Sequence, residues 1–273
     1  MATEVRAAAL GEVRSATTAG GGTALTSTVQ KIALLRNTKF LEMIPRNFST
    51  AVVVQYNFNP YLIILKTTDL LAAEANITEY SDNAQDGSTS TDVTLSSLGT
   101  LAQADAVYVG SWTPFGGVTI DVDAANANAS VLTVTYWKSD STWADISATD
   151  GTDSGGASMA VDGDVTWTVP SDWVAEALEV AVPSTAHKNL GVLTAPQYWT
   201  RWVFSAALDS TTTQNSWLAI NRSTAYGEMA AGQSREQGIT VGPGGFYSVS
   251  AKTDAGTANL IINCFTLQPP SRF

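Results

Sequence analysis

All eight tryptophans of this 273-residue chain lie between Val107 and Ile220, within short runs of strand-forming residues. Val, Thr, Ile and Tyr flank them, and Gly, Asn, Asp and Ser separate the runs. Large aromatic side chains need a large and rigid core. Short β-branched runs with turn residues between them are typical of β-sandwiches and jelly rolls. The sequence therefore predicts an all-β fold.

Two further groups of strands flank the tryptophan-rich block. Strand-forming runs are expected at residues 30–35, 39–44, 51–58 and 61–67, and again between 238 and 267. Neither group has enough strands to bury a sheet face alone, so we expect the two to pair. The predicted modules are a discontinuous β-sandwich of residues 26–104 plus 226–273, and a tryptophan-rich sandwich or jelly roll of residues 105–225.

Residues 1–25 are predicted to form an extended N-terminal arm. Gly11 interrupts the only short helical pattern, and the segment ends in the flexible tract Gly20-Gly21-Gly22. Such a terminus is ordered only where something holds it, and a neighbouring subunit is the simplest candidate. Fully extended, the arm reaches on the order of 80 Å. We expect Arg6, Leu10 and Arg14 to contact that partner.

Composition restricts the partners. Only 14% of residues are charged and the formal net charge is −11. Without a Lys/Arg stripe the chain is not expected to bind nucleic acid. A surface with few charged residues does little to prevent association with other protein chains, which suits a subunit of an assembly. No apolar stretch approaches the length of a membrane span, so no membrane partner is expected. The single cysteine, Cys264, lies in an apolar run and is predicted to be buried.

Residues for covalent chemistry are scarce. The only histidine, His187, lies in a polar loop, and no G-x-S-x-G elbow occurs. One His and one Cys cannot close a zinc shell, and no cofactor is expected. Asp121, Asp123, Asn126 and Asp150 are weak calcium candidates, although their spacing matches no EF-hand loop and such residues are common in turns. A pair of carboxylates acting as in a glycosidase is a further alternative. Because residues for covalent chemistry are scarce, we predict that the chain is not an enzyme.

Three aromatic residues next to turns are candidate contact residues. Trp112, Phe115 and Trp143 neighbour Gly, Ser, Thr or Pro, which makes them candidates for exposure. Exposed aromatic rings stack on sugar rings and bind protein partners. Core packing is the default interpretation for tryptophans within strands, and it is expected for most of the eight.

From Val107 onward the sequence resembles β-sandwich domains of tailed-bacteriophage virion proteins. The resemblance covers about residues 105–220. It is carried by Tyr108-Val109-Gly110-Ser111, Pro114-Phe115-Gly116-Gly117-Val118, Ala125-Asn126-Ala127-Asn128, Leu132-Thr133-Val134-Thr135-Tyr136-Trp137, Trp143, Asp150-Gly151-Thr152, Asp162-Gly163-Asp164-Val165-Thr166-Trp167, Pro170-Ser171-Asp172-Trp173 and Tyr198-Trp199-Thr200-Arg201.

This resemblance implies a virion structural protein with no catalytic residues. A capsid decoration (cement) protein, which binds and stabilises the phage head through its arm and sandwich contacts, is the favoured expectation. The implied partners are the major capsid protein or other virion proteins, with a homo-oligomer, in particular a trimer, on the capsid surface. The alternative is a tail or fibre component that binds host-surface carbohydrate through exposed aromatics.

Overall fold

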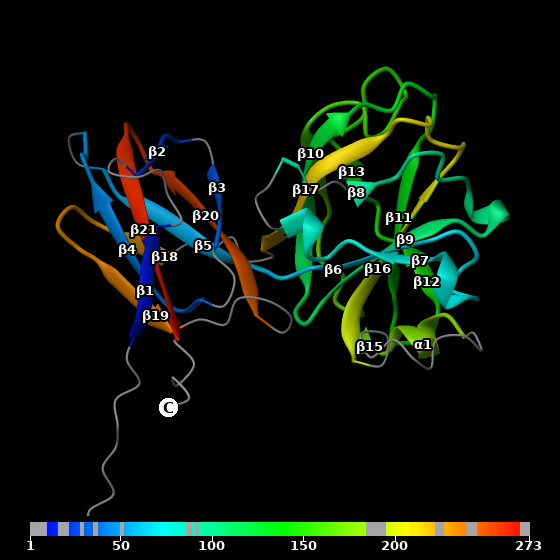
Figure 1. Cartoon of the computed structure of the whole chain (residues 1–273), viewed down its shortest axis with the longest axis horizontal. Coiled ribbons are helices and arrows are strands. Elements are labelled where there is room, and N and C mark those ends of the chain that lie inside the picture. The colour runs from blue at the N-terminus through cyan, green and yellow to red at the C-terminus, as the bar shows by residue number, and fades with distance from the viewer. Residues whose placement is uncertain are drawn as a thin grey trace, which may run out of the picture. The chain divides into compact units, whose positions relative to one another are not determined.

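The computed structural model is built almost entirely of β-strands, which confirms the predicted all-β class (Figure 1). It describes residues 10–15, 22–27, 30–34, 38–49, 52–85, 89–90, 93–183, 195–221, 227–238 and 245–267. The chain forms two compact units. Unit 1 consists of Met1–Phe58 with Ser223–Phe273, and unit 2 consists of Asn59–Arg222.

Unit 1 contains two sheets made from both ends of the chain. The first sheet has the order β1 (Leu10–Ser15), β21 (Ala258–Leu267), β4 (Thr38–Arg46) and β19 (Arg235–Gly238). The short strand β2 (Thr23–Leu25) also pairs with β21. The second has the order β18 (Gly227–Met229), β5 (Val54–Pro60), β20 (Phe246–Thr253) and β3 (Gln30–Ala33). Alternate residues of β21 are buried, including Leu260, Ile262 and Cys264, as expected for a strand with one face on a core.

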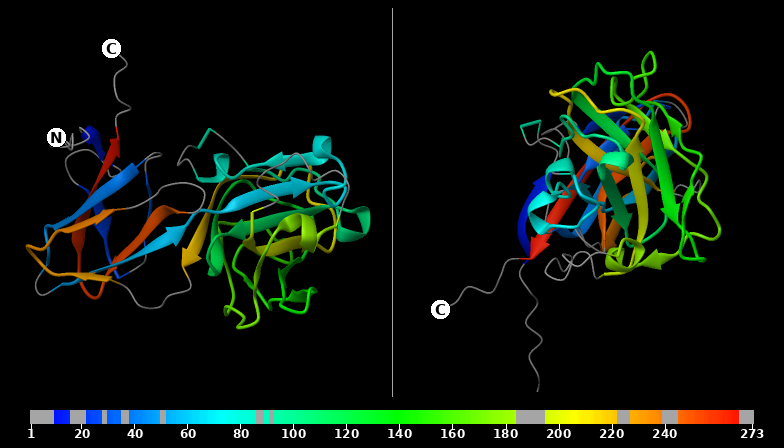
Figure 2. Two further views of the ribbon diagram at one scale, coloured as in Figure 1. Left: turned by 90° about the horizontal axis from the view of Figure 1, so that it is seen from below. Right: turned by 90° about the vertical axis from the view of Figure 1, so that its right-hand side faces the viewer.

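The predicted arm held by a neighbouring subunit is wrong for the residues of this segment that the structure describes. β1 pairs antiparallel with β21, placing Val13 opposite Phe265, and β2 pairs with the same strand from Thr23 to Leu25. These first and last strands lie side by side in both views of Figure 2 (blue and red). Pairing satisfies backbone groups that an extended arm would leave to solvent or to a partner. Residues 1–9 and 16–21 lie outside the described residues.

Unit 2 contains a seven-stranded and a five-stranded sheet. The larger, sheet C, has the order β12 (Trp143–Asp145), β11 (Leu132–Trp137), β16 (Gln197–Phe204), β9 (Ala106–Ser111), β6 (Ile63–Thr67) and β7 (Ile77–Glu79), and β15 (Ala175–Glu176) also pairs with β16. The smaller, sheet D, has the order β13 (Thr149–Asp150), β14 (Gly163–Thr166), β10 (Phe115–Ala124), β17 (Thr213–Asn221) and β8 (Val93–Thr94).

This arrangement corrects the predicted module boundary. Residues 59–104 were expected in the first sandwich, but β6 pairs with β9 from Ile63 to Thr67 and β8 pairs with β17. The boundary lies next to residue 58, since β5 belongs to a sheet of unit 1 and β6 to sheet C.

The main core of unit 2 contains Trp167, Trp173, Trp202 and Trp217, and Trp202 and Trp217 have ring centroids 5.0 Å apart. The described helices are short: η1 (Glu74–Asn76), η2 (Asn83–Gln85), η3 (Leu101–Gln103) and α1 (Leu178–Ala181). Among the described residues, no helix is long and apolar enough to cross a membrane.

Candidate binding surface on unit 2

The second face of sheet C carries an aromatic cluster separate from the main core. Residues of β11 and β16 alternate, so Tyr136 and Trp202 belong to the main core while Trp137 and Trp199 point to the other face. Trp199 is fully buried there, although it lies outside the main core. Its indole N–H donates to the Glu176 carbonyl, 3.0 Å away, which ties β15 to this face.

Trp143 is the half-buried centre of this cluster. Its ring centroid lies 5.4 Å from that of Trp137, its partner across the β11–β12 hairpin, and 5.8 Å from that of Tyr108. Its indole N–H donates to the Ala181 carbonyl at 3.1 Å. The Arg201 guanidinium carbon lies 4.8 Å from the Trp143 ring centroid, in a cation–π contact. Trp143 is therefore held on several sides and offers only part of its ring to a partner.

Burial raises the pKa of Tyr108 to about 12, against the opposing effect of the nearby Arg201 charge. The Tyr108 phenol is therefore neutral at physiological pH and is not a candidate general base.

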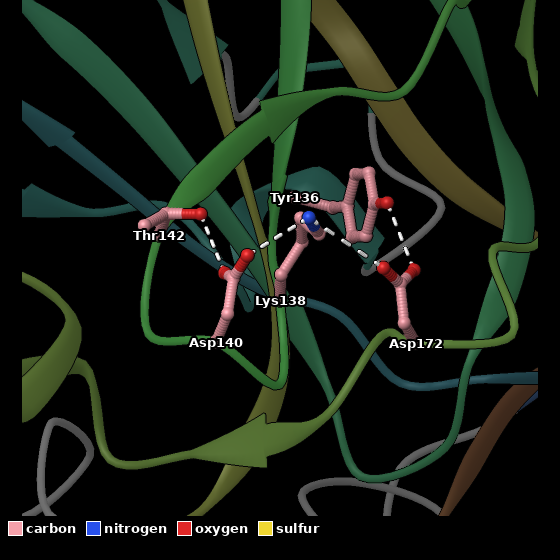
Figure 3. Close-up of polar contacts among 5 residues, drawn as sticks. All are labelled: Tyr136, Lys138, Asp140, Thr142 and Asp172. Atoms are coloured by element: carbon pink, nitrogen blue, oxygen red, sulfur yellow. Dashed lines mark hydrogen bonds and ion pairs between the residues drawn. The ribbon is translucent and has the colours of Figure 1, made fainter.

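The turn of the same hairpin carries a cluster of polar contacts (Figure 3). Lys138 Nζ lies 3.0 Å from Asp140 Oδ2 and 3.8 Å from Asp172 Oδ2. The Thr142 hydroxyl donates to Asp140 Oδ1 at 2.6 Å, and the Tyr136 hydroxyl donates to Asp172 Oδ1 at 2.9 Å. Because the Tyr136 ring belongs to the main core, the cluster fastens the hairpin and the Asp172 segment to the sandwich.

The charges of the turn are mutually stabilised. Hydrogen bonds from Thr142 and Lys138 lower the pKa of Asp140, and the bond to Asp140 raises the pKa of Lys138. The Asp140 contribution to stability is present at neutral pH and is lost as pH falls through its lowered pKa, whereas that of Lys138 is lost only in strong alkali. At neutral pH this surface offers an aromatic ring, two cations and two carboxylates for hydrogen bonding and stacking.

The structure places the three aromatic candidates very differently. Trp112 is 40% exposed, in the segment that follows β9. Trp143 is half-buried as described. The prediction for Phe115 is wrong, because its side chain is fully buried against Trp167 and Trp173, with ring centroids 5.4 and 5.3 Å away. Phe115 opens β10, and its alternation places it on the core face.

Of the three arm candidates, Leu10 and Arg14 belong to β1, where their backbone pairs with Leu267 and Cys264. Arg6 and the loop residue His187 lie outside the described residues.

The calcium candidates do not gather around one point. Asn126 is buried and binds backbone through both ends of its amide: it donates to Asn128 and Ser158 and accepts from Asp209. Asp150 accepts two hydrogen bonds from Thr152. Among the described residues, no three His, Cys, Asp or Glu side chains form a group able to hold a metal ion.

Asp121 has a carboxylate neighbour that the spacing did not reveal. Burial, followed by the charge of Asp162, raises the pKa of Asp121, and Asp123 adds a smaller effect of the same sign. Asp162 also accepts a hydrogen bond from the Val122 amide, 2.9 Å away, so the pair lies where the loop before β14 meets β10. The two carboxylates repel each other at neutral pH.

Sequence reasoning missed Arg201 and Tyr108 as parts of the aromatic cluster. A usable signal was present, because the run Tyr198-Trp199-Thr200-Arg201-Trp202 has large side chains at adjacent positions. In a strand this puts bulk on both faces and indicates burial on both.

A scan of the chain against protein-family models found no matching family, and a search of curated proteins found no matching relative. The function is therefore inferred from the chain's own residues and their arrangement.

Proposed function

We propose that this chain is a structural subunit of a tailed-phage virion, a capsid decoration protein that stabilises the head. This proposal rests on the positions, within unit 2, of the residues that carry the resemblance to virion proteins. Trp167 donates its indole N–H to the Phe115 carbonyl at 2.9 Å, and Trp173 donates to the Trp199 carbonyl at 3.2 Å. Residues that carry the proposed resemblance thus hold the sandwich together, which supports a role as a building block.

Because β1 and β2 pair with β21 of the same chain, residues 1–25 do not all serve as an arm that binds a neighbouring subunit. Among the strands that the structure describes, β1 lies at the edge of its sheet, and edge strands present unpaired backbone groups to a further strand or chain. We propose that residues 1–9, together with the β1 edge, contact the major capsid protein or another virion protein. The low density of charge on the chain favours such contacts. The proposed assembly is a homo-oligomer on the capsid surface, with a trimer as the expected state.

The test uses particles of the phage whose genome encodes the chain. Mass spectrometry of purified virions is expected to detect the chain, and electron cryo-microscopy is expected to place it on the head. Heads lacking the protein should regain it when the full-length chain is added. Deletion of residues 1–9 should lower occupancy without changing the Tm, whereas deletion of residues 268–273 is the matched control. Absence of the chain from purified virions would overturn the proposal.

A second candidate function is carbohydrate binding on a tail or fibre, and the 40% exposure of Trp112 favours it. Glycan-array binding that is lost in Trp112→Ala would support this function. Val131→Ala is the matched control, since Val131 is a 57% exposed apolar residue of the same unit. Density on the tail rather than the head would point the same way.

A further inference from the structure

The buried polar atoms of unit 2 that lack a hydrogen-bond partner are concentrated in one short segment, at the start of β17. Among the described residues, nine buried side-chain nitrogen and oxygen atoms are unpaired, and five of them belong to residues 212–217. Those five are Thr212 Oγ1, Gln214 Nε2, Gln214 Oε1, Asn215 Oδ1 and Trp217 Nε1. Buried polar groups in native proteins are nearly always paired with protein or with ordered water. This concentration therefore requires a specific explanation.

Thr212 immediately precedes β17, and Gln214 is the second residue of that strand. They are two residues apart in the chain, so their Cα atoms lie within about 7 Å of each other. Both residues are fully buried. Gln214 is paired in register with Val122 of β10 on one side and Val93 of β8 on the other, so its backbone lies between two strands of sheet D.

A second buried glutamine of unit 2 shows what a paired amide looks like. Gln85 accepts from the Leu62 amide at 2.9 Å, and its Nε2 donates to the Leu62 carbonyl at 2.8 Å and to the Ser81 carbonyl at 2.6 Å. Gln214 has the same chemistry and the same burial but none of these contacts. The difference between the two glutamines singles out the Gln214 amide as a site for a small ligand.

We infer that Gln214 and Thr212 together bind an ordered internal water molecule. The two side chains provide one amide donor, one amide acceptor and one hydroxyl, and a buried water requires two to four such partners. The site is formed by neutral groups, which suits a neutral ligand rather than an ion. This site is independent of the proposed virion function, because it concerns the interior of unit 2 alone.

The direct test is a crystal structure of the full chain at a resolution that shows ordered water. The expected result is a water oxygen within about 3.2 Å of both the Gln214 amide and Thr212 Oγ1. Protein atoms paired with the Gln214 amide, or an amide with no neighbour at that distance, would overturn the inference.

A set of variants tests the site in solution through the sign of the change in Tm. Gln214→Met keeps the side-chain length and removes the amide. With a bound water, Gln214→Met and Thr212→Val each lower the Tm by about 2 °C or more, and the double variant loses less than the sum because both remove the same water. Without a bound water, Gln214→Met raises the Tm because it removes an unpaired buried amide. Gln85→Met is the matched control and should lower the Tm in either case. A rise in Tm for Gln214→Met, or additive losses in the double variant, would refute a shared water.

Discussion

Gly110 is the position where the smallest change tests the two-sided packing of sheet C most sharply. It lies in the middle of β9, paired with Trp199 on one side and Ile63 on the other. A Cβ atom added at Gly110 would lie 2.5 Å from the Cε3 and Cζ3 atoms of the Trp199 indole. Gly110→Ala therefore forces Trp199 to move, although the new methyl group is small.

The cost follows from how firmly Trp199 is held. Its side chain is fully buried, and its N–H bond to the Glu176 carbonyl fixes the edge of the ring. Overpacking a well-filled core by a methyl group costs about 1–3 kcal/mol, and loss of the Glu176 hydrogen bond adds about 1 kcal/mol. Because unit 2 is a medium-sized domain, each kcal/mol corresponds to about 2–4 °C, so the expected fall in Tm is about 4–16 °C.

A double-mutant cycle with Trp199→Leu provides the assay. Trp199→Leu alone destabilises by leaving a cavity, but it also gives the Gly110→Ala methyl group the space it lacks. Differential scanning calorimetry of the four proteins should show that Gly110→Ala costs little when it is combined with Trp199→Leu, with a coupling energy of at least about 1 kcal/mol. If Gly110→Ala is equally destabilising with and without Trp199→Leu, the steric argument is wrong and backbone effects at Gly110 are responsible.

Three further variants test individual interactions. Asp121→Asn should raise the Tm at neutral pH, with a gain in the free energy of unfolding of less than about 1 kcal/mol, because it removes repulsion from Asp162. The gain should vanish at acidic pH, where the raised pKa leaves Asp121 protonated. Tyr108→Phe should leave the phenolate absorbance that develops between about pH 9 and 11 unchanged, since burial moves the pKa of Tyr108 to about 12; a loss in that range would contradict the burial. Gly22→Ala should destabilise by about 1–3 kcal/mol in urea unfolding, because Gly22 has φ +74° and a Cβ would lie 2.7 Å from the Leu260 carbonyl oxygen; an unchanged midpoint would show that β2 is not tightly docked.

The strands were predictable where a short-range pattern determines them. The alternation in residues 131–137 gave the two faces of β11, with Val134 and Tyr136 on the main core and Trp137 opposite. Burial of Cys264 followed in the same way from its place in an apolar run. Both cases depend on neighbours within a few residues, which a single sequence contains.

Pairings between distant strands were not determined by such patterns. β6 is apolar and could be assigned to either group of strands, and only its pairing with β9, some 40 residues later, places it in unit 2. Phe115 was misjudged for a related reason, because Pro114 and the following glycines look like an exposed turn while the ring lies against Trp167. The error at β1 was of the same kind, since Gly11 weakens any local strand signal and its partner is the last strand of the chain.

The concentration of tryptophan follows from the position of sheet C in unit 2. A sheet that packs on one side only needs bulky residues at every second position, but β16 has Trp199 on one face and Trp202 on the other, both fully buried. Large rings on both faces fix the sheet from two sides. On the second face, Trp143 contacts Arg201 and is paired with Trp137 across the β11–β12 hairpin, which fixes the position of its ring. Rigidity of this kind lowers the entropy lost on binding, because the side chains around Trp143 are already held in place before a partner arrives.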